Sequence, residues 1–176
     1  MKARSLHRRL APAIVVPLAL TVVSGMAFRV GRSWFGLSAD FGRWMMALHE
    51  GRYLGEQLVP LYVLSVGLAL LAMIGSGLSL LRRPRLRSWH AWLAPLLFAP
   101  LMVSAITGIS FRLGKSWFDL PAPVTRWLLK VHQGSYLGKD LRVMYVLLLG
   151  LGALALLGTG LGMTSLWRRR SAGFGG

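Results

Sequence analysis

The 176-residue sequence contains no cysteine and only five acidic residues. The absence of cysteine excludes disulfides, thiolate metal sites, iron–sulfur clusters and thiol catalysis. The long apolar segments contain no carboxylate, so they lack the group that usually couples transport to protons. No glycine-rich segment has the spacing of a phosphate-binding loop, and no nucleophile lies beside a base.

Hydrophobic residues make up 55% of the chain, which suits a protein in lipid better than a soluble domain of this size. Four apolar runs are long enough to cross about 30 Å of hydrocarbon. They cover residues 10–28, 58–81, 93–111 and 141–166. Lysine and arginine outnumber the acids by 21 to 5 and flank these runs. This placement is typical of membrane topology signals and argues against nucleic-acid binding.

The chain is a tandem repeat with a constant offset of 83 residues, which separates His7 from His90 and His49 from His132. The segment HRRLAPAIVVPLALTVVSGMAFRVGRSWF lies over HAWLAPLLFAPLMVSAITGISFRLGKSWF without a gap. The first apolar run resembles a signal peptide, but its pattern recurs inside the chain, so we expect it to be a retained helix.

Each copy contains two apolar runs, so we expect two two-helix units at residues 1–83 and 84–170, and a flexible cytoplasmic tail at 171–176. Two copies that cross in the same direction predict an all-α integral membrane protein. Its fold would be a four-helix transmembrane bundle with a pseudo-twofold axis along the membrane normal.

The acids all lie between the two runs of a copy, whereas the N-terminal, middle and C-terminal segments carry only positive charge. This bias predicts that both termini and the middle loop are cytoplasmic. We expect a multi-pass protein of a bacterial plasma membrane or an internal photosynthetic membrane. Apolar stripes at helical spacing also predict a short interfacial amphipathic helix in each outer loop. The stripes are formed by Phe41, Trp44, Met45 and Leu48, and by Val124, Trp127, Leu128 and Val131.

The four histidines of the chain form the two repeat-related pairs His7/His90 and His49/His132. About 21 helical residues, or roughly 31 Å, separate His7 from Phe28, so His7 and His49 cannot share one centre. Across a twofold axis, His7 would face His90 and His49 would face His132. Two facing imidazoles are what a hexacoordinate b-type haem needs. The alternative is that these histidines are ordinary polar residues at a membrane border.

Repeat-matched arginines and glycines accompany the histidines. At the outer level, Arg29 and Arg112, and Arg43 and Arg126, are candidates to pair with haem propionates, or else contact solvated headgroups. The glycines would either leave room for a flat macrocycle or allow close helix packing. Gly25 and Gly108 lie toward the outer pair, and Gly75, Gly77, Gly158 and Gly160 lie toward the inner pair.

The element LHRRLAP, followed by LHEGRYLG and by a span ending in Gly-x-Gly-Leu before arginines, resembles the PepSY-associated transmembrane helix proteins. WHAWLAP and VHQGSYLG repeat the pattern in the second copy, so the resemblance covers most of the chain. Family members include periplasm-facing ferric siderophore reductases whose two haems are bound by paired histidines. The resemblance implies that His7, His49, His90 and His132 are axial ligands. The sequence contains no PepSY domain and no flavin or nicotinamide domain, which leaves donor and substrate open.

These patterns predict a ferric reductase-like membrane cytochrome with two haem b groups. It would carry electrons across the membrane from a cytoplasmic-side or quinol donor to an outer acceptor such as ferric iron. Membrane lipid and a partner membrane subunit are further expected partners, and nucleic acid is not. The alternative is a cofactor-free accessory subunit of a larger membrane complex. A transporter is disfavoured because no charge lies within the spans.

Overall fold

The computed structural model describes residues 3–81 and 89–163, and every regular element in these ranges is a helix. Four are long: α1 (Ala3–Ser33), α3 (Val59–Leu81), α4 (Trp89–Ser116) and α6 (Lys139–Gly162). Two are shorter: α2 (Ala39–Glu50) and α5 (Ala122–His132). Single 3₁₀ turns lead back from the short helices: η1 (Arg52–Leu54), η2 (Glu56–Leu58) and η3 (Ser135–Leu137).

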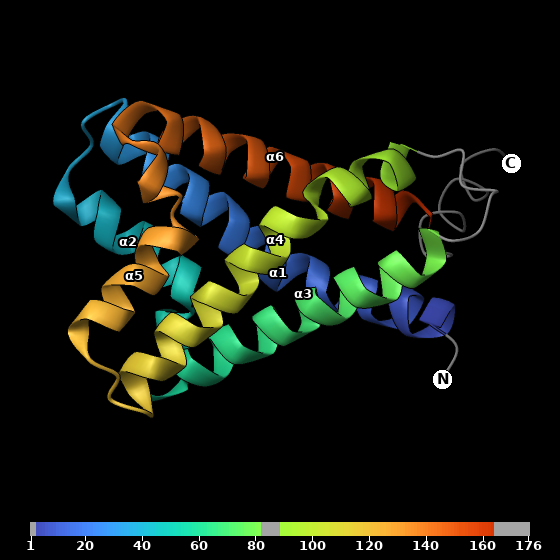
Figure 1. Cartoon of the computed structure of the whole chain (residues 1–176), viewed down its shortest axis with the longest axis horizontal. Coiled ribbons are helices and arrows are strands. Elements are labelled where there is room, and N and C mark those ends of the chain that lie inside the picture. The colour runs from blue at the N-terminus through green and yellow to red at the C-terminus, as the bar shows by residue number, and fades with distance from the viewer. Residues whose placement is uncertain (1–2, 82–88, 164–176) are drawn as a thin grey trace, which may run out of the picture.

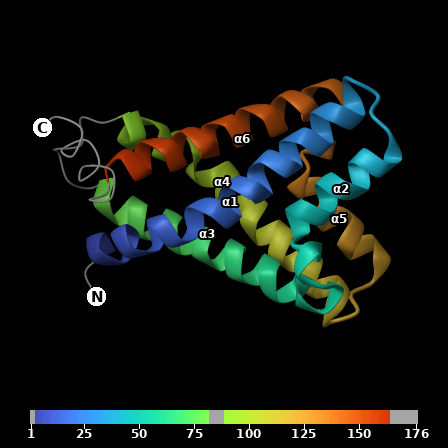
Figure 2. The ribbon, with the colours of Figure 1, turned by 180° about the vertical axis from the view of Figure 1, so that it is seen from behind.

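The four long helices form a ring in which α1 and α4 each contact both α3 and α6. The short helix α2 packs on α1, and α5 packs on α4. Both short helices lie at one end of the bundle, opposite the end where α1 begins and α6 ends (Figure 1). Figure 2 shows the same arrangement from behind, with α1 and α6 side by side. The contacts of α1 with α2, α3 and α6 thus correspond to those of α4 with α5, α6 and α3.

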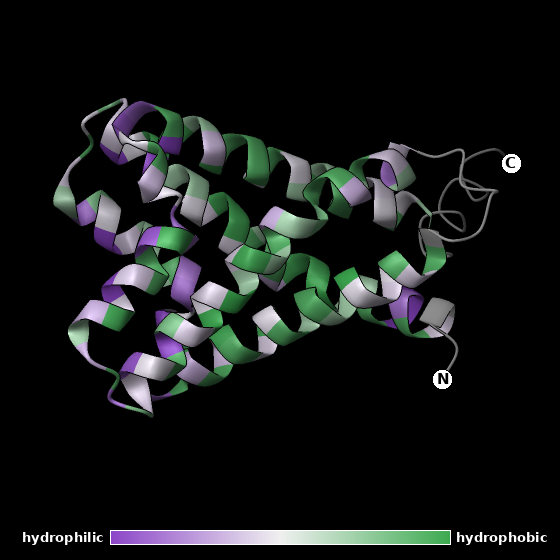
Figure 3. Ribbon diagram, in the orientation of Figure 1, coloured by the Kyte–Doolittle hydropathy of each residue, from purple (hydrophilic) through white to green (hydrophobic). Residues whose placement is uncertain are grey.

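The long helices are long and apolar enough to cross a membrane. Hydrophobic residues follow them through the middle of the bundle, and hydrophilic residues gather around α2, α5 and the adjoining helix ends (Figure 3). Large apolar side chains point outward on these helices: Val16 is 71% exposed, Leu96 74% and Leu148 65%. Such exposure is compatible with a multi-pass membrane protein, since lipid would cover these side chains.

The helices α1 and α4 are longer than the apolar runs at 10–28 and 93–111 predicted, and they extend past both ends of each run. The extension matters because it includes His7 and His90 in the regular helices. Each of these helices also contains two prolines, Pro12 and Pro17 in α1 and Pro95 and Pro100 in α4. The other two long helices, α3 and α6, form near the predicted runs at 58–81 and 141–166.

The buried core is small and apolar. Leu97 and Leu101 of α4 and Ala153 of α6 form its centre, and partly buried side chains of all four long helices pack around it. The basic segments at 82–88 and 164–176, with the predicted tail at 171–176, lie outside the described residues.

Candidate functional site: two facing histidine pairs

His49 and His132 lie at the end of the bundle that carries α2 and α5, and they are called the outer pair for that reason. They stand near the ends of these short helices, where a glycine turns the chain. Gly51 ends α2 with φ 77°, and Gly134 follows α5 with φ 65°. Glycine adopts this left-handed conformation at no steric cost. A side chain at either position would also strike the ring of Tyr62 or Tyr145. The His-x-Gly element therefore fixes where each helix stops, and with it the position of His49 and His132.

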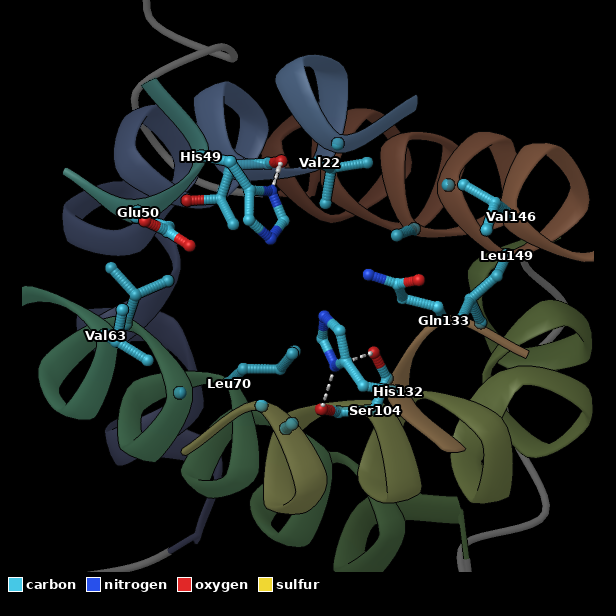
Figure 4. Close-up of a pocket in the computed structure, with 18 of the residues that line it drawn as sticks. Val22, His49, Glu50, Val63, Leu70, Ser104, His132, Gln133, Val146 and Leu149 are labelled. Carbon is cyan, nitrogen blue, oxygen red and sulfur yellow. Dashed lines mark hydrogen bonds between the residues drawn. The ribbon is translucent and has the colours of Figure 1, made fainter. Parts of the chain in front are cut away.

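His49 and His132 face one another across a cavity, with ring centres 6.3 Å apart and ring planes at 61°. The Nδ1 of His49 lies 2.7 Å from the carbonyl oxygen of Thr21, and the Nδ1 of His132 lies 2.9 Å from that of Ser104. A carbonyl only accepts, so each Nδ1 donates its proton and each Nε2 keeps a free lone pair. Both free nitrogens point toward the middle of the cavity (Figure 4).

Burial favours the neutral form of both outer imidazoles. Desolvation lowers the pKa of His132 to about 4, and His49 adds electrostatic repulsion. Desolvation also lowers the pKa of His49. Both rings are therefore neutral at physiological pH, which is the form that binds a metal.

The inner pair repeats this geometry at the other end of the bundle. The ring centres of His7 and His90 are also 6.3 Å apart, with the planes at 76°. The Nδ1 of His7 lies 3.0 Å from the Ser76 hydroxyl, and that of His90 lies 3.1 Å from the Thr159 hydroxyl.

The hydroxyls of Ser76 and Thr159 determine which inner ring nitrogen carries the proton. Each hydroxyl donates to a backbone carbonyl of its own helix, Ser76 to Ala72 at 2.7 Å and Thr159 to Ala155 at 2.6 Å. A hydroxyl has one proton, so it accepts from the imidazole Nδ1. Nε2 is again left free. Sequence reasoning missed these two residues, although their offset of 83 and their place in apolar helices were visible.

The predicted glycines have a more direct role than clearance for a macrocycle. A Cβ atom at Gly25 would lie 2.9 Å from the His49 ring, and one at Gly108 would lie 3.0 Å from the His132 ring. Real Cβ atoms keep at least 3.4 Å in ordinary contacts. These two glycines therefore let the imidazoles pack directly against the helix backbones of α1 and α4.

The inner glycines divide into two kinds. A Cβ at Gly77 or Gly160 would lie 3.4 Å from the ring of His7 or His90, which is ordinary contact. At Gly75 and Gly158, such a position has no heavy atom of the described residues within 4 Å, apart from chain neighbours and the backbone of its own helix. Only the second glycine of each Gly-x-Gly element therefore touches a histidine.

Each histidine pair opens into a cavity between the helices. The outer cavity has a volume of about 230 Å³ and is lined by His49, His132 and mostly apolar side chains. The inner cavity, of about 100 Å³, contains His7 and His90. One layer of four residues borders both cavities and separates them: Leu18, Leu70, Leu101 and Ala153.

The four predicted arginines do not share one location. Arg29 and Arg112 line the outer cavity, where each also lies over a phenylalanine ring of its own helix. Arg43 and Arg126 do not line it. Both are exposed, and Arg43 forms an ion pair with Asp40 on the outer face of α2.

Two further polar residues line the outer cavity and were missed from the sequence. Glu50 follows His49, and its repeat counterpart Gln133 follows His132. Glu50 bonds to Arg112 of the other copy, and Gln133 accepts a hydrogen bond from Arg29 of the other copy. The sequence signal for these residues was that each directly follows a paired histidine, as His-Glu in the first copy and His-Gln in the second.

The spacing of each histidine pair fits one six-coordinate iron. A metal–imidazole bond is about 2 Å long and a ring nitrogen lies about 1.2 Å from the ring centre, so two such ligands have ring centres about 6.4 Å apart. Both pairs have 6.3 Å. In residues 3–81 and 89–163, no group of three or more histidine, cysteine, aspartate or glutamate side chains comes together. Two protein ligands are enough when a porphyrin supplies the other four.

Comparison with protein-family models, curated proteins and solved structures gives no match. The chemistry of the two sites therefore depends on their own geometry. That geometry comprises pairs of imidazoles whose free nitrogens are directed at each other and mostly apolar cavities with glycines on their borders.

Proposed function

We propose that the chain is a di-haem b-type membrane cytochrome that carries electrons across the membrane. The observation that supports this most strongly is the equal spacing of the two histidine pairs, 6.3 Å in both, with every Nδ1 engaged in a hydrogen bond. A structural histidine has no reason to leave its second nitrogen facing another histidine across a cavity. Each pair joins one histidine from each copy of the repeat, and both ends of the bundle have the same facing arrangement of two imidazoles.

In this proposal, His49 and His132 hold an outer haem b, and His7 and His90 hold an inner one. The hydrogen bonds at Nδ1 fix each ring and increase the basicity of Nε2. Bound haem supplies one-electron chemistry, and with both axial positions taken it favours outer-sphere transfer. The resemblance to the PepSY-associated family leads to the same assignment and adds ferric chelates as a class of acceptor.

The proposal includes an orientation. Both termini and the loop between the copies lie in the cytoplasm of a bacterial plasma membrane, and α2 and α5 lie along the outer interface. The two copies are related by a pseudo-twofold axis along the membrane normal, which brings each histidine to its counterpart. A quinol or a cytoplasmic-side protein is then the donor, and the acceptor meets the outer surface.

The test is the haem content of four alanine variants of the full chain in mild detergent. His49→Ala and His132→Ala should each remove the outer haem and leave the inner one, and His7→Ala and His90→Ala should do the reverse. Low-temperature absorption spectra distinguish the two haems. The ring planes at 61° and 76° also lead us to expect strongly anisotropic low-spin ferric EPR signals.

Four variants that keep two unchanged haems would refute the proposal. So would wild-type protein that is purified without haem from cells with sufficient haem supply. A cofactor-free accessory subunit would then be the better assignment.

A further inference from the structure

The two copies differ at one polar position of the outer cavity. Glu50 and Gln133 are repeat-related and lie on opposite sides of the cavity in Figure 4, with the two histidines between them. One copy therefore provides a carboxylate, and the other provides a neutral amide. Glu50 contacts Arg112 and Gln133 contacts Arg29. These two arginines are also repeat-related, so both copies have arginine at this position.

On the Glu50 side, each arginine has a counter-ion within the protein. Arg112 lies 2.5 Å from one carboxylate oxygen of Glu50, and Arg52 lies 2.7 Å from the other. Glu50 is buried, and the Arg112 side chain is only 13% exposed. Arg112 therefore has a counter-ion with which it forms a close ion pair.

On the Gln133 side, the positive charge has no counter-ion. Arg29 is 8% exposed, and its hydrogen-bond partner is the neutral Gln133 oxygen at 2.9 Å. Gln133 is linked through Ser135 to a second cation, Arg142, whose Nη1 donates to Ser135 at 3.2 Å. The Nε of Arg142 is buried and has no hydrogen-bond partner among the residues that the structure describes. In residues 3–81 and 89–163, no carboxylate lies within ion-pair distance of Arg29 or Arg142.

A buried guanidinium without a counter-ion is costly, and a carboxylate is the anion that its planar donor fork fits best. Arg112, the repeat counterpart of Arg29, does not offer a second anion site, because it is already paired with Glu50. We propose that Arg29 forms a carboxylate-binding site in the outer cavity, on the Gln133 side only, with Arg142 increasing the local positive potential.

Two sources could supply this carboxylate: a propionate of a porphyrin bound between His49 and His132, or a free carboxylate anion from solution. The first case rests on the proposed haem function, whereas the site itself does not. In that case the porphyrin has one preferred orientation, with a propionate toward Arg29 and away from the negative charge of Glu50.

The test uses the full chain in detergent and three variants. Arg29→Gln removes the site, and Gln133→Glu gives Arg29 an internal carboxylate, as Glu50 does for Arg112. Since Gln133→Glu adds a counter-ion to a buried charge, it should fold even if Arg29→Gln does not. Lys130→Gln is the matched control, because it removes one positive charge from an exposed position of α5.

The first measurement is the rate of haem transfer to excess apomyoglobin, with natural haem and with its dimethyl ester. A lost charge-assisted hydrogen bond corresponds to roughly tenfold or more in affinity. Loss of outer haem should accelerate about tenfold in Arg29→Gln and Gln133→Glu but not in Lys130→Gln, and the ester should show no difference. This result would identify the propionate as the occupant.

The second measurement is the thermal midpoint as citrate is added, which requires no haem. A saturable rise in wild type and Lys130→Gln that is absent in the two site variants would identify a free carboxylate. If neither measurement distinguishes the site variants from Lys130→Gln, the anion site does not exist. That outcome leaves the di-haem proposal intact. Wild-type protein that is purified without haem from cells with sufficient haem supply, but that responds to citrate, would refute the di-haem proposal and support the anion site.

Discussion

Replacing Gly25 with alanine places a methyl group against the imidazole of His49. The new Cβ would lie 2.9 Å from both Cε1 and Nδ1 of the ring, whereas ordinary contact begins at 3.4 Å. The ring must therefore retreat by at least about half an ångström, and metal–ligand bonds tolerate about 0.2 Å. Forcing an extra methyl group into a packed site typically costs about 1–3 kcal/mol. We expect Gly25→Ala to lose or perturb the outer haem and leave the inner haem unchanged.

Other glycines of the chain serve as graded controls. Gly108→Ala repeats the clash at 3.0 Å from His132 and should behave like Gly25→Ala. Gly77→Ala brings a methyl to 3.4 Å from His7 and should be tolerated. Gly75→Ala meets nothing within 4 Å and should retain both haems, because alanine is favoured over glycine in a helix by about 1 kcal/mol.

The assay combines haem per protein by pyridine haemochrome with EPR of the ferric state. Gly25→Ala and Gly108→Ala should each show a loss or shift of the same low-spin signal. If Gly25→Ala keeps both signals unchanged, then His49 does not hold an iron in this cavity, and the argument from packing fails. If Gly75→Ala loses haem as readily, the effect of the glycines is on the helices and not on the imidazoles.

Three further outcomes are expected. Topology reporters fused near Gly36 and Pro121 should report an external location, and reporters at Arg85 and at the tail should report a cytoplasmic one. An external signal at Arg85 would reverse the proposed orientation. In haem-free protein, the unfolded chain binds protons near pH 6.5 that His132, with its pKa lowered to about 4, does not. Its free energy of unfolding should therefore be level above pH 6.5 and decrease toward pH 4, by up to about 1.4 kcal/mol per pH unit. The thermal midpoint should fall over the same range, and a flat profile would contradict the burial of His132. In stopped-flow experiments, anionic ferric complexes should reoxidise the reduced protein faster than cationic ones, and the preference should vanish between about 0.01 M and 1 M salt. The absence of any preference at low salt would argue against an outer acceptor site.

The four long helices and the pairing of the histidines could be predicted because their signals are periodic. Apolar runs identify the long helices, and the offset of 83 residues relates His7 to His90 and His49 to His132. The ring distances of 6.3 Å agree with that pairing. The ends of α1 and α4 were less predictable, because polar residues continue a helix beyond its apolar run without changing its backbone.

The remaining features of the site could not be predicted, because they depend on the directions of side chains and on contacts between helices. Arg43 precedes His49 by six residues, or about 240° around the helix, so the two could not share a face even though both lie on α2. The carbonyls of Thr21 and Ser104 that orient the outer rings carry no sequence signal, because every residue has a carbonyl. The pairing of Arg112 with Glu50 crosses from one copy to the other, and only the packed bundle brings these residues together.

The layer of Leu18, Leu70, Leu101 and Ala153 between the two cavities also has a consequence for the membrane as an electrical insulator. A continuous file of water through both cavities would let protons leak down their gradient. Water needs polar partners to remain in a protein interior, and these four side chains offer none. Both cavities share this layer as a wall, so in the proposed cytochrome it would keep the two haem sites close while it blocks ions. If the proposed function holds, replacing Leu18 or Leu101 by a polar residue should let protons leak through the membrane before it slows electron transfer.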